Sequence, residues 1–249
     1  MKRSLFCVLM VVLIASCAFA AASSDLTAKG ILDRMDELMD YDSCIMSATM
    51  VNTDRLGSTS MVFTTYQKGD GDTLLVVTQG PDKGQKILRL DSDIYIYYPD
   101  ADEVIRLSSS GLKNSFLGSD FSYEDLTGDD DYDSRYESSL EDNVVVDGIE
   151  CFAILLKARK SSETYQMERV YVDVSTFLPV KFEMYSKSAK LLKSMYYSNY
   201  IEDKGSFFPG FIKVVNAVKK NSYSDITIDS LSFGEKLDPS MFDKEELAW

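Results

Sequence analysis

The chain has 249 residues, with 26 lysines and arginines against 40 aspartates and glutamates and no histidine, so its formal charge is −14. The missing histidine excludes Ser-His-Asp and Cys-His nucleophiles, histidine-ligated zinc or haem, and a histidine pH switch. The acidic balance argues against nucleic acid as a partner, because neutralising phosphates requires clustered lysine and arginine.

The first 22 residues have the three parts of an export signal: Lys2 and Arg3, an apolar run over 5–14, and small residues after it. The apolar run is too short to span a bilayer, which favours a cleaved signal. Ala-Phe-Ala at 18–20 predicts a signal peptide over 1–20 and a soluble product. Residues 14–17 instead resemble a lipobox, which would remove 1–16 and leave an acylated Cys17. Either way we expect a periplasmic protein, tethered to a membrane in the second case.

The next segment has the pattern of one amphipathic helix. Ser24 is a residue type that caps helices. The apolar positions recur at spacings of three and four residues, at Ala28, Ile31, Leu32, Met35, Leu38 and Met39. Such a helix packs on its surroundings by a single stripe.

After residue 42 the chain consists of short segments rich in Val, Ile, Tyr, Phe and Thr, separated by turn residues. The expected strands are 45–52, 58–67, 73–79, 85–90, 93–98, 103–108, 150–158, 165–174, 179–186, 191–201, 211–218 and 225–233. About a dozen antiparallel strands with short turns predict a large curved sheet or a partly closed barrel. No linker divides it, so we expect a single domain over 21–249.

Alternation within the strands predicts one wet face and one covered face. Val170, Val172 and Val174 share a face, and the same spacing places Val180, Phe182 and Met184 together. A single short helix is too small to cover so wide a sheet. A bound apolar ligand is one candidate for the remaining cover.

An insertion over about 109–142 interrupts the strand pattern. Phe116 and Leu117 in its first half favour a functional flap, and residues 122–126 look like one capped helical turn. Ten acidic residues lie between 119 and 142, opposed only by Arg135. We therefore expect the second half to be a solvated loop.

Two cysteines, Cys44 and Cys151, lie beyond the signal region. In an exported protein they are candidates for one disulfide. The alternative is that both are small buried side chains within strands. Two cysteines without histidine do not make a zinc site, and we expect no metal or other cofactor.

Several segments, in this order, resemble the LolA-like family of outer-membrane lipoprotein-sorting proteins. They are residues 86–90, 94–99, 104–107, 116–126, 148–152, 170–173, 178–181, 193–198 and 237–247. The string Gly-Ser-Asp-Phe-Ser-Tyr-Glu-Asp-Leu at 118–126 is the most specific of them. The resemblance covers the chain from about Asp25 to its last residue.

The resemblance implies a mainly β fold with few helices: an incomplete antiparallel β-barrel of about eleven strands, with helices over its concave apolar face. It also implies a non-enzymatic, monomeric carrier that holds the acyl chains of lipoproteins. Such a carrier would take its cargo from an inner-membrane transporter and pass it to an outer-membrane receptor. The insertion would serve as a lid.

The cavity lining follows from the inward strand faces and the apolar part of the lid. The candidates are Met61, Phe63, Leu75, Val77, Val172, Val180, Phe182 and Met184 on strands, and Phe116, Leu117 and Phe121 on the lid. Ordinary core packing explains each of these residues equally well. Other hypotheses are a carrier of phospholipid or another apolar ligand, an envelope adaptor whose acidic flap docks a cationic partner, and a hydrolase.

Overall fold

The computed structural model describes residues 26–248, except 70, 92, 109 and 127–131. The export signal, Cys17 and Ser24 lie outside the described residues. Among the helices that are described, none has the length and apolar character needed to cross a membrane.

The described part of the chain is mainly β, and fourteen of its strands form one antiparallel sheet. The strands are β1 Ser43–Asp54, β2 Gly57–Lys68, β3 Asp72–Gln79, β4 Lys86–Leu90, β5 Asp93–Tyr98, β6 Glu103–Arg106, β7 Tyr136–Leu140, β8 Val144–Val146, β9 Ile149–Ala158, β10 Met167–Asp173, β11 Pro179–Tyr185, β12 Leu191–Ser198, β15 Phe211–Asn216 and β16 Tyr223–Phe233. A separate hairpin is made by β13 Ile201–Asp203 and β14 Ser206–Phe208. The sheet order is β6-β5-β4-β3-β2-β1-β16-β15-β12-β11-β10-β9-β7, with β8 also paired to β9.

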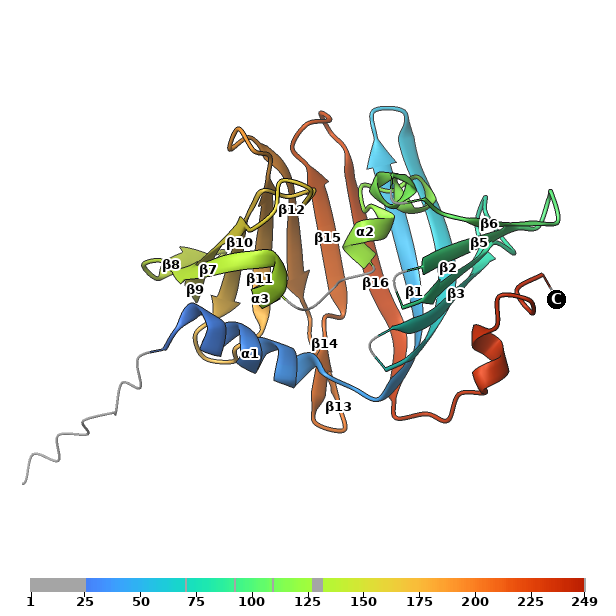
Figure 1. Cartoon of the computed structure of the whole chain (residues 1–249), viewed down its shortest axis with the longest axis horizontal. Coiled ribbons are helices and arrows are strands. Elements are labelled where there is room, and N and C mark those ends of the chain that lie inside the picture. Colours follow the sequence, from blue (N-terminus) through green and yellow to red (C-terminus); the bar gives the residue numbers. More distant parts are fainter. Residues whose placement is uncertain (1–25, 70, 92, 109, 127–131, 249) are drawn as a thin grey trace, which may run out of the picture.

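The two ends of the sheet are not paired to each other, so it forms an incomplete barrel (Figure 1). Its middle is the pairing of β1 with β16, which joins the first and last strands of the chain. The outer edges are β6 and β7, and they are neighbours in sequence. The chain between them must therefore travel from one edge of the sheet to the other, and this is where the predicted lid insertion falls.

The core fills the concave side of the sheet. The predicted alternation is seen in β10, where Val170 and Val172 are fully buried and Tyr171 is half-buried. One continuous cluster joins these inner residues to the buried stripe of helix α1, Ala28–Met39. Figure 1 shows α1 and the short helix α2, Tyr123–Leu126, in front of the curved sheet.

A smaller cluster lies on the other face of the sheet. Leu74 and Leu88, from β3 and β4, pack there against Phe242 and Leu247 of the C-terminal segment. This segment includes the 3₁₀ helix η3, Pro239–Phe242. Strands β3 and β4 are therefore covered on both faces, which explains why Leu74 and Leu75 are both buried.

The prediction of a solvated loop for the second half of the insertion is wrong for residues 132–140, and residues 127–131 lie outside the described part of the chain. Residues Tyr136–Leu140 form β7, which pairs with β9 at the edge of the sheet, and Tyr136 is 1% exposed. The helical turn α3, Tyr132–Arg135, comes just before it. The local pattern around Tyr136 is polar, and only the pairing with a strand later in the chain makes it β structure.

Helix α1 begins one turn later than predicted from Ser24. Thr27 is the N-cap, and its hydroxyl accepts a hydrogen bond from the Gly30 N–H at 3.0 Å. An N-cap oxygen satisfies one of the backbone donors that a helix leaves free at its start. The buried residues Ile31, Leu32 and Met35 confirm the predicted stripe.

This cap gives a stability prediction. Thr27→Ala should lower the free energy of unfolding by about 1 kcal/mol, because the Gly30 N–H loses its acceptor. Urea denaturation measures the change. Thr27→Ser is the matched control, since it keeps the hydroxyl, and an equal loss in both variants would contradict the capping role.

Of the two alternatives for the cysteines, one disulfide or two buried thiols, the structure has the second. Cys44 and Cys151 are both free and buried. They lie on β1 and β9, with five strands of the sheet between them, and adjacent strands are about 4.8 Å apart. Burial raises the pKa of the Cys44 thiol to about 12, so this side chain behaves as a small apolar residue.

Candidate functional site

We define the lid segment as residues 111–126, which contain two 3₁₀ turns and α2. Gly111–Lys113 and Phe116–Gly118 are the two turns. A short loop closes on itself through the Phe116 N–H, which donates to the Phe121 carbonyl at 2.8 Å. Leu117 has φ of +47°, in the left-handed region that non-glycine residues seldom occupy. The segment is therefore shaped by its own hydrogen bonds rather than by regular secondary structure.

A capping box begins α2, as the sequence predicts. The Ser122 hydroxyl accepts from the Asp125 N–H at 3.2 Å, and the Asp125 carboxylate accepts from the Ser122 N–H at 2.7 Å. These reciprocal bonds satisfy two backbone donors. They also fix the direction in which the Asp125 carboxylate points.

The underside of the lid segment is apolar and fully inserted into the concave face. Phe116, Leu117 and Phe121 are 2%, 7% and 1% exposed. The Phe116 ring meets Phe63 of β2 at 6.5 Å and Tyr123 at 5.5 Å, both nearly perpendicular. Such edge-to-face contacts are favourable beyond the area that they bury. All of these residues belong to the main core cluster.

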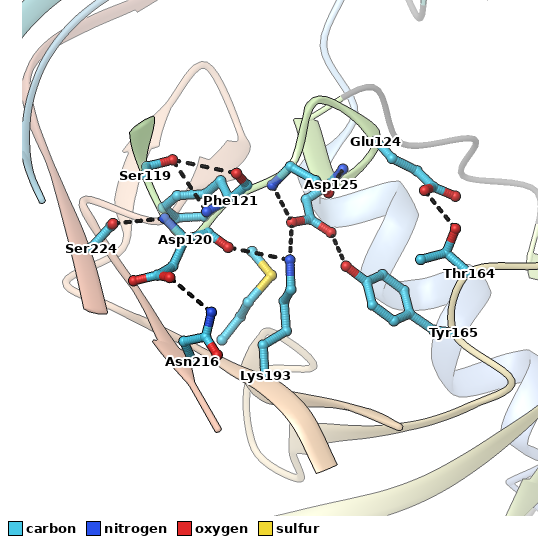
Figure 2. A network of polar contacts seen from close by, with 12 residues as sticks. Ser119, Asp120, Phe121, Glu124, Asp125, Thr164, Tyr165, Lys193, Asn216 and Ser224 are labelled. Carbon is cyan, nitrogen blue, oxygen red and sulfur yellow. Dashed lines mark hydrogen bonds and ion pairs between the residues drawn. The ribbon is translucent and has the colours of Figure 1, made fainter. Parts of the chain in front are cut away.

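Polar side chains on the inner wall of the sheet hold this segment in place (Figure 2). The Asp120 carboxylate accepts from Asn216 Nδ2 at 2.9 Å and from Ser222 Oγ at 2.7 Å. The Asp125 carboxylate accepts from Lys193 Nζ at 2.6 Å and from the Tyr165 hydroxyl at 2.7 Å. The lid segment is therefore attached to the wall through two carboxylates that water does not reach freely.

The ion pair between Lys193 and Asp125 is buried, since the two side chains are 12% and 1% exposed. Lys193 Nζ also donates to the Asp120 carbonyl at 3.2 Å and lies 5.5 Å from the centre of the Tyr165 ring. A buried pair is weak evidence for net stability, but removing one partner leaves an uncompensated charge. A change that separated Lys193 from Asp125 would therefore leave two buried charges without their partners.

The inner wall also carries a buried acid of its own, Glu168. In the strand register Glu168 of β10 is opposite Met184 of β11, which is opposite Lys193 of β12. The Glu168 carboxylate accepts from the Tyr136 hydroxyl at 2.6 Å. Burial raises the pKa of Glu168 to about 7, against the hydrogen bond from Tyr136, which lowers it.

The structure brings ten of the eleven predicted lining residues into the main core cluster. These are Met61, Phe63, Leu75, Val77, Phe116, Leu117, Phe121, Val172, Phe182 and Met184, all less than 9% exposed. They contact one another in a closed core, and their role in holding a ligand stays a prediction.

Val180 does not share the buried face as predicted. It is half-buried, and Pro179 takes the buried place beside Phe182 and Met184. The cause is an irregularity of the register between β10 and β11, where Tyr171 is opposite Lys181 and Val172 is opposite Pro179. One extra residue in a strand reverses the alternation beyond it.

The sequence interpretation missed the polar residues of the wall. Lys193 is two residues before the buried Met195, and Asn216 is two residues after the buried Val214, so both are on the inner face of their strands. A lysine at such an inward position was the sign in the sequence that the wall is partly polar. Asp120 and Asp125 lie within the string 118–126, in which Phe121 was the one residue predicted to line the site.

The hypothesis of an acidic docking flap stays a prediction, because three of its ten acids, Asp129, Asp130 and Asp131, lie outside the described residues. Asp120 and Asp125 point inward and are taken up by wall donors. Asp133 lies at the surface instead, where it pairs with Lys29 of α1 at 2.6 Å. Within the described residues no group of three or more Cys, Asp or Glu side chains is arranged to hold a metal ion.

An open pocket of about 810 Å³ borders the lid segment. The tips of two neighbouring hairpins form its sides, residues 52–59 between β1 and β2 and residues 218–224 between β15 and β16. Leu117, Gly118 and Asp120 of the lid segment form part of its lining. The pocket therefore leads from solvent to the polar attachment of the lid.

A family model described as "Uncharacterized protein" matches residues 69–249 of the chain. A comparison with curated proteins finds no match. Among solved structures, the chain is similar to a DUF1329 family protein from Desulfovibrio piger, with 26% identity and a TM-score of 0.81 over 88% of this chain and 98% of that one.

Two further solved structures are similar over most of the chain. A LolA superfamily protein from Nitrosomonas europaea has 25% identity and a TM-score of 0.72, covering 89% of this chain and 99% of its own. A domain from Vibrio parahaemolyticus, named for outer membrane lipoprotein sorting, has 21% identity and a TM-score of 0.80, covering 88% and 97%. The last of these shows a shared fold.

Proposed function

We propose that the chain, which belongs to the family whose model matches residues 69–249 and is similar over most of its length to a LolA superfamily protein, is a non-enzymatic periplasmic carrier of acyl chains. The cargo would be acylated lipoproteins or lipids, held against the concave face of the sheet within the domain 21–249. The pattern of an export signal in the first 22 residues supports the compartment. A membrane transporter would load the carrier and an outer-membrane receptor would unload it.

The observation that carries this proposal is the way in which the lid segment is attached. Its apolar side chains Phe116, Leu117 and Phe121 fill the concave face, whereas its fixed points are side-chain hydrogen bonds and one ion pair. Such a cover can leave without breaking any strand pairing of the sheet. The apolar face that it uncovers would then be free for an acyl chain.

The burial energies of the lid side chains and of an acyl chain favour the replacement of the lid segment by the acyl chain on the concave face. Each of the three lid side chains gains about 1.5–3 kcal/mol from burial, whereas an acyl chain of about 16 carbons gains about 0.8 kcal/mol per methylene, or roughly 12 kcal/mol. A bound chain therefore outweighs the apolar contacts of the lid segment. Breaking the polar contacts of the lid segment costs free energy. This cost lowers the net free energy of acyl-chain binding and keeps the binding reversible.

Loosening the lid should speed the uptake of an acyl probe. Asp120→Ala removes the acceptor for Asn216 and Ser222, and hydrogen bonds to a charged group contribute about 1.5–3 kcal/mol. We expect the delipidated variant to take up a fluorescent fatty acid at least about tenfold faster than the parent protein in stopped-flow measurements.

Asp229→Ala is the matched control for this experiment. Asp229 is exposed on β16, where its carboxylate accepts only from Thr49 at 2.8 Å, so its removal should leave the uptake rate unchanged. The proposal is overturned if the native protein carries no lipid by mass spectrometry and neither it nor Asp120→Ala takes up the probe.

A further inference from the structure

The inner wall presents a set of hydrogen-bond donors that converge on carboxylates. Lys193 lies on β12, Asn216 ends β15, Ser222 comes just before β16, and Tyr165 precedes β10. They are far apart in sequence, yet all four donate to carboxylate oxygens of the lid segment at 2.6–2.9 Å. Figure 2 shows Lys193 between Asp120 and Asp125.

These donors lose their acceptors when the lid segment leaves. Ser222 and Tyr165 are 8% exposed, and the Lys193 side chain is 12% exposed. An unpaired buried donor, and above all an unpaired buried ammonium, is costly. Opening therefore creates a demand for a new anionic acceptor at the place where the two lid carboxylates were.

We infer that this wall, formed by Lys193, Tyr165, Asn216 and Ser222, binds the anionic head group of the cargo in place of the lid carboxylates. The ligand class is an amphiphile with a carboxylate or phosphate head and an acyl chain. In the closed protein Asp120 and Asp125 occupy the positions of the head-group oxygens. The inference rests on the proposed carrier function and names the cargo of that site.

The open pocket gives the head group a route to this wall. Its lining includes Ser222 and Ser224. It also carries three cations, Arg55, Lys219 and Lys220, and three carboxylates, Asp54, Asp82 and Asp120, so the charges balance in the closed protein. When Asp120 leaves with the lid segment, three cations face only Asp54 and Asp82, so the lining carries a net charge of +1 in a chain whose formal charge is −14. A field of this sign favours the arrival of an anion.

The apolar part of the same wall adjoins the donors. Met184 is opposite Lys193 in the neighbouring strand, and Phe182 packs edge to face on Tyr197 with ring centres 5.4 Å apart. Glu168, the remaining acid in this row, is separated from Lys193 by β11 and is occupied by the Tyr136 hydroxyl. A bound amphiphile would therefore place its head group at Lys193 and extend its acyl chain over an apolar surface.

A pair of probes with the same chain and different heads tests the inference. cis-Parinaric acid carries a carboxylate, and its methyl ester is neutral. Fluorescence titration of the delipidated protein should show at least about tenfold tighter binding of the acid than of the ester, as expected for charge-assisted hydrogen bonds. Equal affinities would overturn the inference, whereas binding of neither probe would overturn the carrier function itself.

The variant Lys193→Met/Asp125→Asn removes both members of the buried pair and leaves no lone charge. Its ratio of acid to ester affinity should fall to about one. Ser222→Ala, a milder change, should lower the ratio about threefold. Lys213→Met is the matched control: Lys213 lies on β15, pairs with Asp225 at 3.2 Å and contacts the Tyr223 ring, and its removal should leave the ratio unchanged. A ratio unchanged in the double variant would contradict the assignment.

Competition separates a lipid head group from a free anion. Dodecyl phosphate should displace cis-parinaric acid at micromolar concentrations, about those at which the fatty acid itself binds. Inorganic phosphate should fail to displace it even at a thousandfold excess, because a factor of roughly this size is the gain in affinity expected from an acyl chain. Equal potency of the two phosphates would assign the wall to a free anion and overturn the inference.

Discussion

Lys193→Met should lower the free energy of unfolding by about 3–5 kcal/mol, because it leaves the Asp125 carboxylate buried without its counter-ion. Asp125 is 1% exposed and keeps only the Tyr165 hydroxyl and the Ser122 N–H as donors. Methionine fills the volume of the aliphatic part of the lysine. The loss of stability therefore measures the effect of removing the charge and not that of creating a cavity. Urea denaturation at pH 7 measures it.

Two variants make this result specific. Lys213→Met removes a half-exposed pair with Asp225, whose side chains are 34% and 25% exposed, and should cost about 0–1 kcal/mol. Lys193→Met/Asp125→Asn should recover most of the stability lost in the single variant. If Lys193→Met costs no more than Lys213→Met, the pair does not hold the lid segment.

Glu168→Gln should stabilise the protein at alkaline pH by about 3 kcal/mol and have little effect near pH 4.5. The reason is the pKa of this carboxyl, which burial raises from 4.5 to about 7 in the folded chain, a change that corresponds to about 3 kcal/mol. The titratable groups around it are the neutral phenol of Tyr136 from β7 and the charged side chains of Arg135 from α3, Asp125 from α2, and Glu163 from the segment before β10.

The sign follows from proton binding. Below pH 4.5 the carboxyl is protonated in both the folded and the unfolded chain, so it costs nothing. Between pH 4.5 and 7 the unfolded chain releases the proton first, and the folded state loses relative stability as the pH rises. Above pH 7 the full cost of a buried carboxylate is present. Glutamine avoids this cost and still accepts a hydrogen bond from Tyr136.

Glu183→Gln is the matched control with the opposite sign. Burial acts to raise the pKa of Glu183, but hydrogen bonds from Lys181, Tyr185 and Tyr171 outweigh it and hold the pKa below its usual range. This carboxylate stabilises the protein above pH 4.5, and the effect is lost as the pH falls through its folded pKa. Unfolding of both variants by urea at pH 4.5 and pH 8 makes the comparison, and a Glu168→Gln protein less stable than the parent at pH 8 would refute the prediction.

The local sequence pattern predicted the elements well where one face of a strand is apolar. The strand predicted over 93–98 has those bounds in the structure, and the predicted bounds of β1, β2 and β9 differ by at most two residues. The resemblance to the LolA-like family also led to the incomplete barrel that the structure shows. Alternation and turn residues are local signals, so a single sequence carries them.

The same pattern failed where a distant partner decides the structure. Tyr136–Leu140 reads as a polar loop, but it becomes the edge strand β7 because β9 offers it hydrogen bonds. Because the register between β10 and β11 is irregular, Val180 does not lie on the buried face. The alternation of apolar and polar residues does not show where such a register shift occurs.

The sequence by itself determined the absence of histidine chemistry, the curved sheet, and an interruption rich in aromatic and acidic residues. Only the tertiary structure decided what those acids do: Asp120 and Asp125 turn inward to Asn216, Ser222, Lys193 and Tyr165 rather than outward to solvent. The physical reason is that a carboxylate is stable in a buried place only if donors meet it there. Those donors lie in strands, or directly before them, some 40 to 100 residues further along the chain, and only the sheet brings them to one wall.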